Sequence, residues 1–202
     1  MFTDMCGTCD ECFSGQYRYC SDKKAIGFKD SYSGFSEYSL ADPRSTVKLP
    51  NELSFESTAP LFCGGVTAYG ALLRVRAKPG QLLNIIGCGG VGHLAIMFAK
   101  SMGYRVHAFD ITNDKLELAR KCGADQAFNS KNPPPDLEKA ASTVVISGAN
   151  AAYQVAADLT ANHGAVVAVG IPMTDLQIPG EINILTLICL RDKRGIKLTN
   201  LT

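Results

Sequence analysis

The chain has 202 residues, enough for one or two domains with a sizeable hydrophobic core. Its 20 basic and 19 acidic side chains are spread along the sequence and nearly cancel, so no electrostatic argument favours binding to nucleic acid or to an anionic membrane. The longest apolar run, 184–190, is far shorter than the roughly 18 residues that a membrane-spanning helix needs, and the N-terminus has no secretory signal. We therefore expect a cytoplasmic protein.

Four cysteines lie within the first 20 residues, at Cys6, Cys9, Cys12 and Cys20. They follow the spacing C-x2-C-x2-C-x7-C in a polar, glycine-rich segment that has little apolar surface to bury. Four thiolates at short spacing can close a tetrahedral zinc site with no open position, which is typical of a structural metal, and metal binding then supplies folding free energy. Disulfides are the alternative interpretation, whereas an iron–sulfur cluster fits less well because the bacterial ferredoxin run has a shorter last gap followed by proline.

Beyond the cysteines the sequence favours β structure, with candidate strands at 25–28, 34–40 and 46–49. A mainly apolar helix is then predicted over 57–73, although two glycines in its middle each cost a helix about 1 kcal/mol relative to alanine. Such glycines often mark the close approach of a ligand or of another backbone. We expect a domain boundary before this helix, which separates a small lobe at 1–56 from a larger domain at 57–202.

The stretch 82–94 reads as a short apolar strand, a glycine-rich turn and the first turn of a helix. In a dinucleotide site Gly87 would permit the tight turn, Gly89 would let the backbone approach a pyrophosphate, and Gly92 would let the helix and strand pack closely. The helix N-terminus would add free N–H groups and the positive end of a helix dipole. The pattern alone is weak evidence in a chain with 19 glycines, but the strand and helix around it favour a dinucleotide-binding unit.

An acidic residue follows at the position that such a unit requires. The helix after the glycine turn ends at Gly103, and the apolar stretch 105–110 is predicted to be the second strand. Asp110 ends that strand, 18 residues after Gly92, close to where the acid that binds the adenosine ribose is expected. A carboxylate accepts hydrogen bonds from a free 2′-hydroxyl and repels a 2′-phosphate, so NAD is favoured over NADP.

Helices and apolar strands alternate through the rest of the chain. Helices are predicted at 114–121, 136–141, 151–159 and 182–190, and strands at 126–128, 143–146, 165–169 and 195–198. Near-continuous apolar strands that alternate with helices indicate a parallel sheet covered on both faces. The predicted fold class is therefore α/β, a doubly wound parallel (Rossmann) sheet with a small β/loop lobe that holds a structural zinc.

The chain resembles the zinc-containing alcohol dehydrogenases of the medium-chain dehydrogenase/reductase family. Three features carry the resemblance: the four-cysteine lobe, the segment Ala59-Pro-Leu-Phe-Cys-Gly-Gly-Val-Thr-Ala-Tyr-Gly-Ala-Leu72, and the glycine-rich cofactor unit. They occur in the order that the family shows and span nearly the whole chain. The resemblance implies an NAD-dependent oxidoreductase that moves a hydride between an alcohol or aldehyde and nicotinamide.

The resemblance also implies roles for individual residues. The structural zinc would be bound by Cys6, Cys9, Cys12 and Cys20. Near the reaction centre, Cys63 would be one thiolate ligand of a catalytic zinc and Thr67 would lie beside the nicotinamide. The pyrophosphate would lie on Gly87, Gly89, Gly90, Val91 and Gly92. The adenosine ribose would be bound by Asp110 and Lys115, and the edge of the nicotinamide would be lined by Val169, Gly170 and Ile171.

The chain departs from the family at both ends. We expect the N-terminal lobe that supplies the other catalytic zinc ligands, and the part that follows the sixth strand, to be missing from this chain, and all three histidines lie in the cofactor half. We therefore expect alcohol oxidation by this chain to be very slow. Two alternatives are a truncated relative repurposed for a metal-independent step and an NAD(H)-binding partner or sensor protein. A small alcohol or carbonyl compound is the expected substrate class, and an exposed sheet edge at 196–198 suggests a homo-oligomer.

Overall fold

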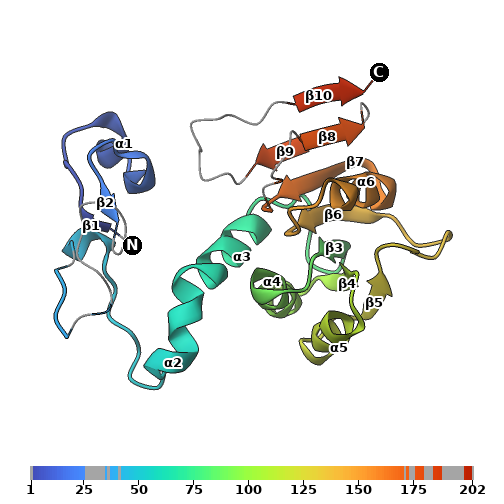
Figure 1. Cartoon of the computed structure of the whole chain (residues 1–202), viewed down its shortest axis with the longest axis horizontal. Coiled ribbons are helices and arrows are strands. Elements are labelled where there is room, and N and C mark those ends of the chain that lie inside the picture. Colours follow the sequence, from blue (N-terminus) through green and yellow to red (C-terminus); the bar gives the residue numbers. More distant parts are fainter. Residues whose placement is uncertain are drawn as a thin grey trace. The chain divides into compact units, whose positions relative to one another are not determined.

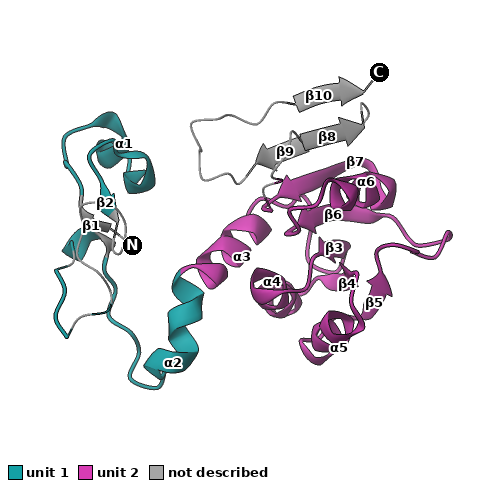
Figure 2. Ribbon diagram, in the orientation of Figure 1, with its two compact units in different colours: residues 1–62 teal, residues 63–202 magenta. Residues whose placement is uncertain are grey.

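The computed structural model describes residues 2–25, 35, 37–40, 42–170, 172, 176–179, 184–187 and 198–201 (Figure 1). The chain forms two compact units, 1–62 and 63–202 (Figure 2). Of the helices in the described ranges, none combines the length and the apolar character needed to cross a membrane.

The first unit has short elements and a core made largely of cysteines. Strand β1 (Phe2–Asp4) pairs antiparallel with β2 (Lys24–Ala25), and the single-turn helices α1 (Asp10–Phe13) and η1 (Tyr17–Tyr19) lie between them in the sequence. The unit continues through η2 (Pro43–Ser45), α2 (Phe55–Thr58) and η3 (Ala59–Phe62). Its buried cluster consists of Met5, Cys12 and Cys20, with Cys6, Cys9 and Tyr17 packed against it. This unit thus has little aliphatic core, and it ends at residue 62, whereas the small lobe was predicted to end at residue 56.

The β structure predicted for this unit is mostly not formed where the structure describes it. In the first candidate strand, 25–28, the structure describes only Ala25, which belongs to β2. Residues 26–28 lie outside the described residues. Residues 35, 37–40 and 46–49 form no strand, so the prediction at 46–49 is wrong. A strand needs a partner for its backbone N–H and C=O groups, and no described segment pairs with 46–49.

The second unit contains the predicted doubly wound sheet. Its six strands are β3 (Leu82–Ile86), β4 (Arg105–Asp110), β5 (Gln126–Asn129), β6 (Ala140–Val145), β7 (Thr160–Ala168) and β9 (Ile184–Leu187). All neighbouring pairs are parallel, and the spatial order is β5-β4-β3-β6-β7-β9. Every residue of β3 is buried, as expected for a central strand covered on both faces. The Rossmann fold predicted from the sequence is confirmed.

Helices α4 (Gly90–Ser101), α5 (Asn113–Lys121) and α6 (Asn150–Leu159) connect the strands. Helix α6 packs on the sheet face that presents Ile86, Phe109 and Val145. Because such crossovers are right-handed, α4 and α5 cover the opposite face, as Figure 1 shows. Helix α3 (Gly64–Leu72) runs against α4, where the Tyr69 and Phe98 rings meet edge to face at 6.3 Å.

Two predicted helices are not formed where the structure describes them. Residues 136–139 are not helical and β6 begins at Ala140, so the helix predicted at 136–141 is wrong. Six residues after a proline run are too few for a stable helix, and β6 pairs with β3 and β7 instead. The buried Ser142 Oγ also accepts the backbone N–H groups of Arg76 at 2.9 Å and Ala77 at 3.1 Å. The helix predicted at 182–190 is wrong at 184–187, which forms β9 alongside β7.

Two other predictions need smaller corrections. The helix predicted over 57–73 is divided into α2, η3 and α3, with a break at Cys63. The sixth strand of the sheet is β9, whereas β10 (Leu198–Leu201) pairs with β8 (Leu176–Pro179) in a separate two-stranded sheet. Residues 195–197, where the sixth strand was predicted to begin, lie outside the described residues.

The buried His107 of β4 predicts a pH-dependent stability. Its side chain is 8% exposed, its ring packs edge to face on Phe128 at 5.4 Å, and its Nδ1 has no hydrogen-bond partner among the described residues. Burial lowers the pKa of His107, and the nearby charges of Glu138, Arg105 and Asp125 only modify that effect. The folded pKa is therefore below the unfolded value of about 6.5, so stability is present above that value and is lost as pH falls through it.

We expect the melting temperature to fall between pH 7.5 and pH 5, and to fall less in His107→Leu. Differential scanning calorimetry over this range measures the slope. The exposed His163, which has φ +63°, is the matched control. His163→Asn should keep the wild-type slope, because asparagine tolerates that backbone conformation. Equal slopes in His107→Leu and the wild type would contradict the assignment.

Candidate functional site

The glycine turn after β3 is held by two close backbone approaches. Gly87 has φ +96°, and a Cβ there would lie 3.0 Å from the backbone nitrogen of Ser147. At Gly92 in α4 a Cβ would lie 1.8 Å from the carbonyl oxygen of Gly87, far inside any allowed contact. Helix α4 can therefore lie against the end of β3 only because residue 92 has no side chain, which is the role that its position in the motif predicts.

The neighbouring glycines, in contrast, border open space. A Cβ at Gly89 or Gly90 would meet no atom within 4 Å. Gly89 is the N-cap of α4, and no side chain accepts a hydrogen bond from the first turn of that helix. The N-terminal N–H groups of α4 thus remain available at the positive end of the helix dipole, an arrangement suited to a phosphate.

Asp110 joins the glycine turn to the loop after β4. The side chain is 6% exposed. Its Oδ2 accepts the N–H of Cys88 at 2.8 Å, and its Oδ1 accepts the N–H of Ile111 at 2.7 Å and of Thr112 at 3.3 Å. The carboxylate therefore has a structural task in addition to any contact with a ligand.

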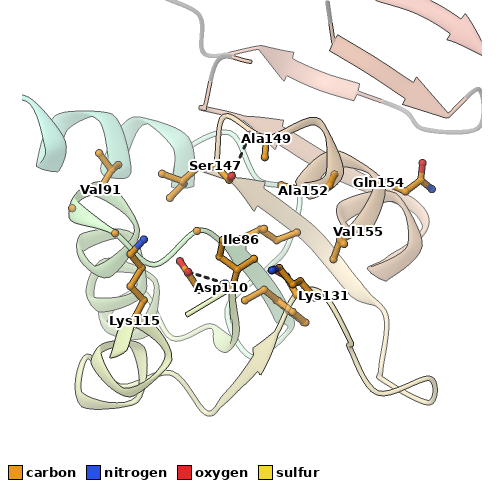
Figure 3. Close-up of a pocket in the computed structure, with 18 residues that line it drawn as sticks. Ile86, Val91, Asp110, Lys115, Lys131, Ser147, Ala149, Ala152, Gln154 and Val155 are labelled. Carbon is orange, nitrogen blue, oxygen red and sulfur yellow. Dashed lines mark hydrogen bonds between the residues drawn. The ribbon is translucent and has the colours of Figure 1, made fainter. Parts of the chain in front are cut away.

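These residues border a cleft of about 860 Å³ at the carboxyl ends of the strands. The cleft lies where β3 and β6 are neighbours, the point at which the strand order reverses and where doubly wound folds bind ligands. Figure 3 shows Lys115 reaching from α5 toward Asp110, with Ala152 and Val155 of α6 on the other side. The lining residues that contribute polar groups or glycines are Gly87, Gly89, Gly90, Asp110, Lys115, Ser130, Lys131, Ser147 and Gln154.

The residues predicted to line the nicotinamide are only partly placed. The N–H groups of Val169 and Gly170 both donate to the carbonyl of Val145, at 2.8 and 3.0 Å. The Tyr153 hydroxyl donates to the carbonyl of Gly170, and a Cβ at Gly170 would lie 2.3 Å from the Ser147 oxygen. Neither residue is among the described residues that line the cleft, and Ile171 lies outside the described residues.

Cys63 and Thr67 occupy successive turns at the start of α3. Cys63 is exposed and is the N-cap of the helix, and its carbonyl accepts the N–H of Thr67 at 3.0 Å. A Cβ at Gly64 would lie 3.4 Å from Leu94 and 3.8 Å from Val91, which are ordinary contact distances, so the packing of α3 on α4 does not require a glycine at this position. Within the described residues, Cys63 belongs to no group of side chains that could hold a metal ion.

The four N-terminal thiols are gathered as a metal site requires. The sulfur atoms of Cys6, Cys9, Cys12 and Cys20 all lie within 4.8 Å of one another. Cys6 Sγ is 3.6 Å from Cys20 Sγ and 3.9 Å from Cys12 Sγ, close to the roughly 3.8 Å between sulfurs of a tetrahedron with zinc–sulfur bonds of about 2.3 Å. All four cysteines are free, so the disulfide alternative is wrong. The donor set therefore fits structural zinc.

The pKa values of the thiols differ within the cluster: those of Cys9 and Cys12 are raised, with burial the largest cause at Cys12, whereas that of Cys6 is lowered. A hydrogen bond from the Thr8 amide to Cys6 Sγ, followed by bonds from the Thr8 side chain and the Cys9 amide, lowers the pKa of Cys6 to about 6 and favours its thiolate. Burial, and secondarily the Asp110 charge, raises the pKa of Cys88 to about 12. The Cys88 thiol beside the cleft is thus protonated and packs as a small apolar group.

Some cleft residues were not predicted from the sequence. Ile111, Ser130 and Lys131 follow β4 and β5, and Ser147 follows β6. Each lies within about three residues of the carboxyl end of a predicted parallel strand, and these ends meet at one edge of the sheet. Their position after these strands was the feature of the sequence that could have identified them as cleft residues.

The strand order, the glycine turn and the cleft define a dinucleotide-binding domain of the Rossmann type. The family model for zinc-binding dehydrogenases matches residues 90–197, and the chain therefore belongs to that family of oxidoreductases. An alcohol dehydrogenase of Geobacillus stearothermophilus is 42% identical over 180 residues, which cover 86% of this chain and 53% of that protein. The chain spans about half the length of the curated relatives it matches.

Solved structures agree with this assignment. The alcohol dehydrogenase of Aeropyrum pernix has a TM-score of 0.71 at 29% identity, over 83% of this chain and 52% of that one. The acetophenone reductase of Geotrichum candidum, solved in complex with NAD, has a TM-score of 0.72 at 26% identity, over 84% and 51%. The family description names zinc, which the four-cysteine cluster could hold, and the Geotrichum enzyme binds NAD, so these findings agree with the predicted cofactors.

Proposed function

We propose that this chain carries the cofactor-binding part of an NAD-dependent, zinc-containing alcohol dehydrogenase. The observation that carries the proposal is the cleft at the reversal of strand order, which the glycine turn and the adjacent Asp110 border together. The chemistry that a bound nicotinamide supplies is reversible hydride transfer to or from an alcohol carbon. The chain's own residues bind and orient the dinucleotide.

Each part of the cleft has a matching part of the dinucleotide. The free N–H groups at the start of α4 suit the pyrophosphate, and the open space at Gly89 and Gly90 lets it approach the backbone. Asp110 and Lys115 suit the hydroxyl groups of the adenosine ribose. Ile111, Ala152 and Val155 offer apolar contacts for the adenine ring. We propose that Val169, Gly170 and Ile171 border the nicotinamide.

The two zinc roles differ in how well the described residues support them. The four-cysteine cluster fits a closed structural site, in which the metal has no open position for a substrate. Cys63 offers one thiolate near the start of α3, and a single thiolate does not hold a catalytic zinc. Polarisation of an alcohol through Cys63 and its orientation by Thr67 therefore need ligands beyond those that the described residues bring together.

Cofactor choice tests the role of Asp110. Asp110→Asn removes the negative charge that disfavours a 2′-phosphate and weakens the acceptor for the 2′-hydroxyl. We expect NADH affinity to fall by about tenfold to a hundredfold, the loss typical of a hydrogen bond to a charged group, while NADPH affinity falls less or rises. Isothermal titration calorimetry with both nucleotides measures the ratio of the two dissociation constants.

The ratio distinguishes recognition from structural damage, because loss of the bonds to Cys88 and Ile111 would weaken both nucleotides alike. Asp114→Asn is the matched control, since Asp114 is exposed on α5, outside the cleft lining, and loses the same charge. It should leave the ratio unchanged. An unchanged ratio in Asp110→Asn would remove Asp110 from ribose recognition, and a wild-type protein that binds neither nucleotide would contradict the proposed function.

A further inference from the structure

Arg44 brings a guanidinium group to the cysteine cluster from a later part of the first unit. Its Nη2 donates to the carbonyl of Met5, the residue before Cys6, at 2.9 Å. Its Nη1 lies over Gly7, where a Cβ would approach within 2.8 Å. Gly7 has φ +73° and lies between the first two cysteines. The guanidinium therefore packs on the backbone on both sides of Cys6.

Asp42 fixes the orientation of this guanidinium. Its carboxylate, 7% exposed, accepts Arg44 Nε at 2.9 and 3.1 Å and also pairs with Nη2. The same carboxylate accepts the backbone N–H of Arg44 at 2.9 Å and so caps η2. A guanidinium held through Nε and Nη2 by a buried carboxylate loses little side-chain freedom when it binds another group. Asp42 thus holds the Arg44 side chain in the orientation in which it contacts Met5 and Gly7.

A cation beside the cysteine cluster is favourable because the metal-bound cluster would be negatively charged. Four thiolates around a divalent ion leave a net charge of about −2, and Asp10 and Glu11 in α1 add further negative charge beside it. Hydrogen bonding to Asp42 raises the pKa of Arg44, and the charges of Asp42, Cys12 and Tyr17 act in the same direction. A permanent cation against the first ligand would offset part of the repulsion among the thiolates.

We propose that Arg44 is a positioning residue for the four-cysteine zinc site, which fixes the backbone at Met5 and Gly7 so that Cys6 points into the site and offsets the charge of the metal–thiolate complex. The inference rests on the structural zinc site of the proposed function. Other cations of the lobe have different contacts. Arg18 lies over the Tyr19 ring at 4.8 Å, and Lys23 donates to the carbonyl of Cys20 at 3.1 Å.

Zinc release tests the proposal. We expect Arg44→Gln to transfer zinc to a chromogenic chelator about tenfold to a hundredfold faster than the wild type, the range typical of partners that orient metal ligands. Arg44→Lys keeps the charge but not the fork, so its rate should lie between the two. Arg18→Gln removes the same charge from the same lobe and should release zinc at the wild-type rate.

Cobalt substitution adds a readout that general destabilisation does not change. The absorption bands of a tetrahedral cobalt–thiolate centre depend on the angles between its ligands, so they should shift in Arg44→Gln and not in Arg18→Gln. Raised salt should reduce the difference in release rate between the wild type and Arg44→Gln, because salt screens the charge component.

The possible results separate the two proposals. Wild-type protein that retains no zinc would contradict the zinc site itself. Zinc-loaded wild type with an equal release rate in Arg44→Gln would contradict only the role of Arg44. If Arg44→Gln does not fold because Asp42 is left without its cation, Arg44→Lys decides, and an unchanged release rate in that variant would overturn the proposal.

Discussion

Replacement of Gly92 by alanine is expected to lower the free energy of unfolding of the second unit by about 3 kcal/mol or more, the upper end of what overpacking costs. The added Cβ would lie 1.8 Å from the Gly87 carbonyl oxygen and 2.8 Å from its carbon. Both are backbone atoms at the end of a fully buried strand, so no side chain can rotate away. Helix α4 must shift, and with it the N–H groups of its first turn.

Gly90→Ala is the matched control for this variant, because a Cβ there meets no atom within 4 Å. Alanine is also the better helix former, so the stability of Gly90→Ala should equal or slightly exceed that of the wild type. Its methyl group would occupy the space where the pyrophosphate approaches, and NADH affinity should fall by about tenfold, or 1.4 kcal/mol. Urea unfolding and calorimetric titration measure the two effects. A Gly92→Ala protein as stable as the wild type would contradict the packing argument.

Gly87 and Gly92 show which structural roles the local sequence can predict. The motif assigned Gly92 to helix–strand packing and Gly87 to the turn: Gly92 lies against the Gly87 carbonyl five residues away, and Gly87 has the positive φ of +96° that suits a tight turn. Strands β3 to β7 and helices α4 to α6 were predicted for a similar reason, since their apolar patterns and glycine ends are local. For the same reason the predicted residues that line the cleft are those of the glycine motif, the end of β4 and the start of α5.

Contacts that depend on strand order could not be predicted in this way. Ser147 lies against both Gly87 and Gly170 because β6 is a neighbour of β3 and β7. The contacts of Ser147 follow from the reversal of strand order in the sheet, and no sequence motif predicts them. The 184–187 segment is an apolar run that periodicity alone does not assign to a strand or a helix, and pairing with β7 decides it. In the first unit, the approach of Arg44 to Met5 joins segments 39 residues apart.

Loss of the zinc site is expected to unfold residues 2–25 while the second unit stays folded. The elements of this segment are a two-residue and a three-residue strand, one turn of α-helix and one turn of 3₁₀ helix, each too short to be stable alone. Its buried cluster is mainly thiol, with Cys20 fully buried. Structural zinc contributes about 10–16 kcal/mol to folding in comparable small sites, more than this cluster can gain by apolar burial.

Cys20→Ser tests this expectation, because serine is a poor zinc ligand of nearly the same size. Hydrogen–deuterium exchange should show peptides from 2–25 losing protection in Cys20→Ser, and in wild-type protein after chelation, while peptides from 82–110 keep theirs. Cys122→Ser changes a cysteine at the end of α5, outside the cluster, and should leave both regions unchanged. Full protection of 2–25 in metal-free protein would mean that apolar contacts alone hold the lobe. Since two cysteines supply much of its buried surface, that result would require a core that the described residues do not contain.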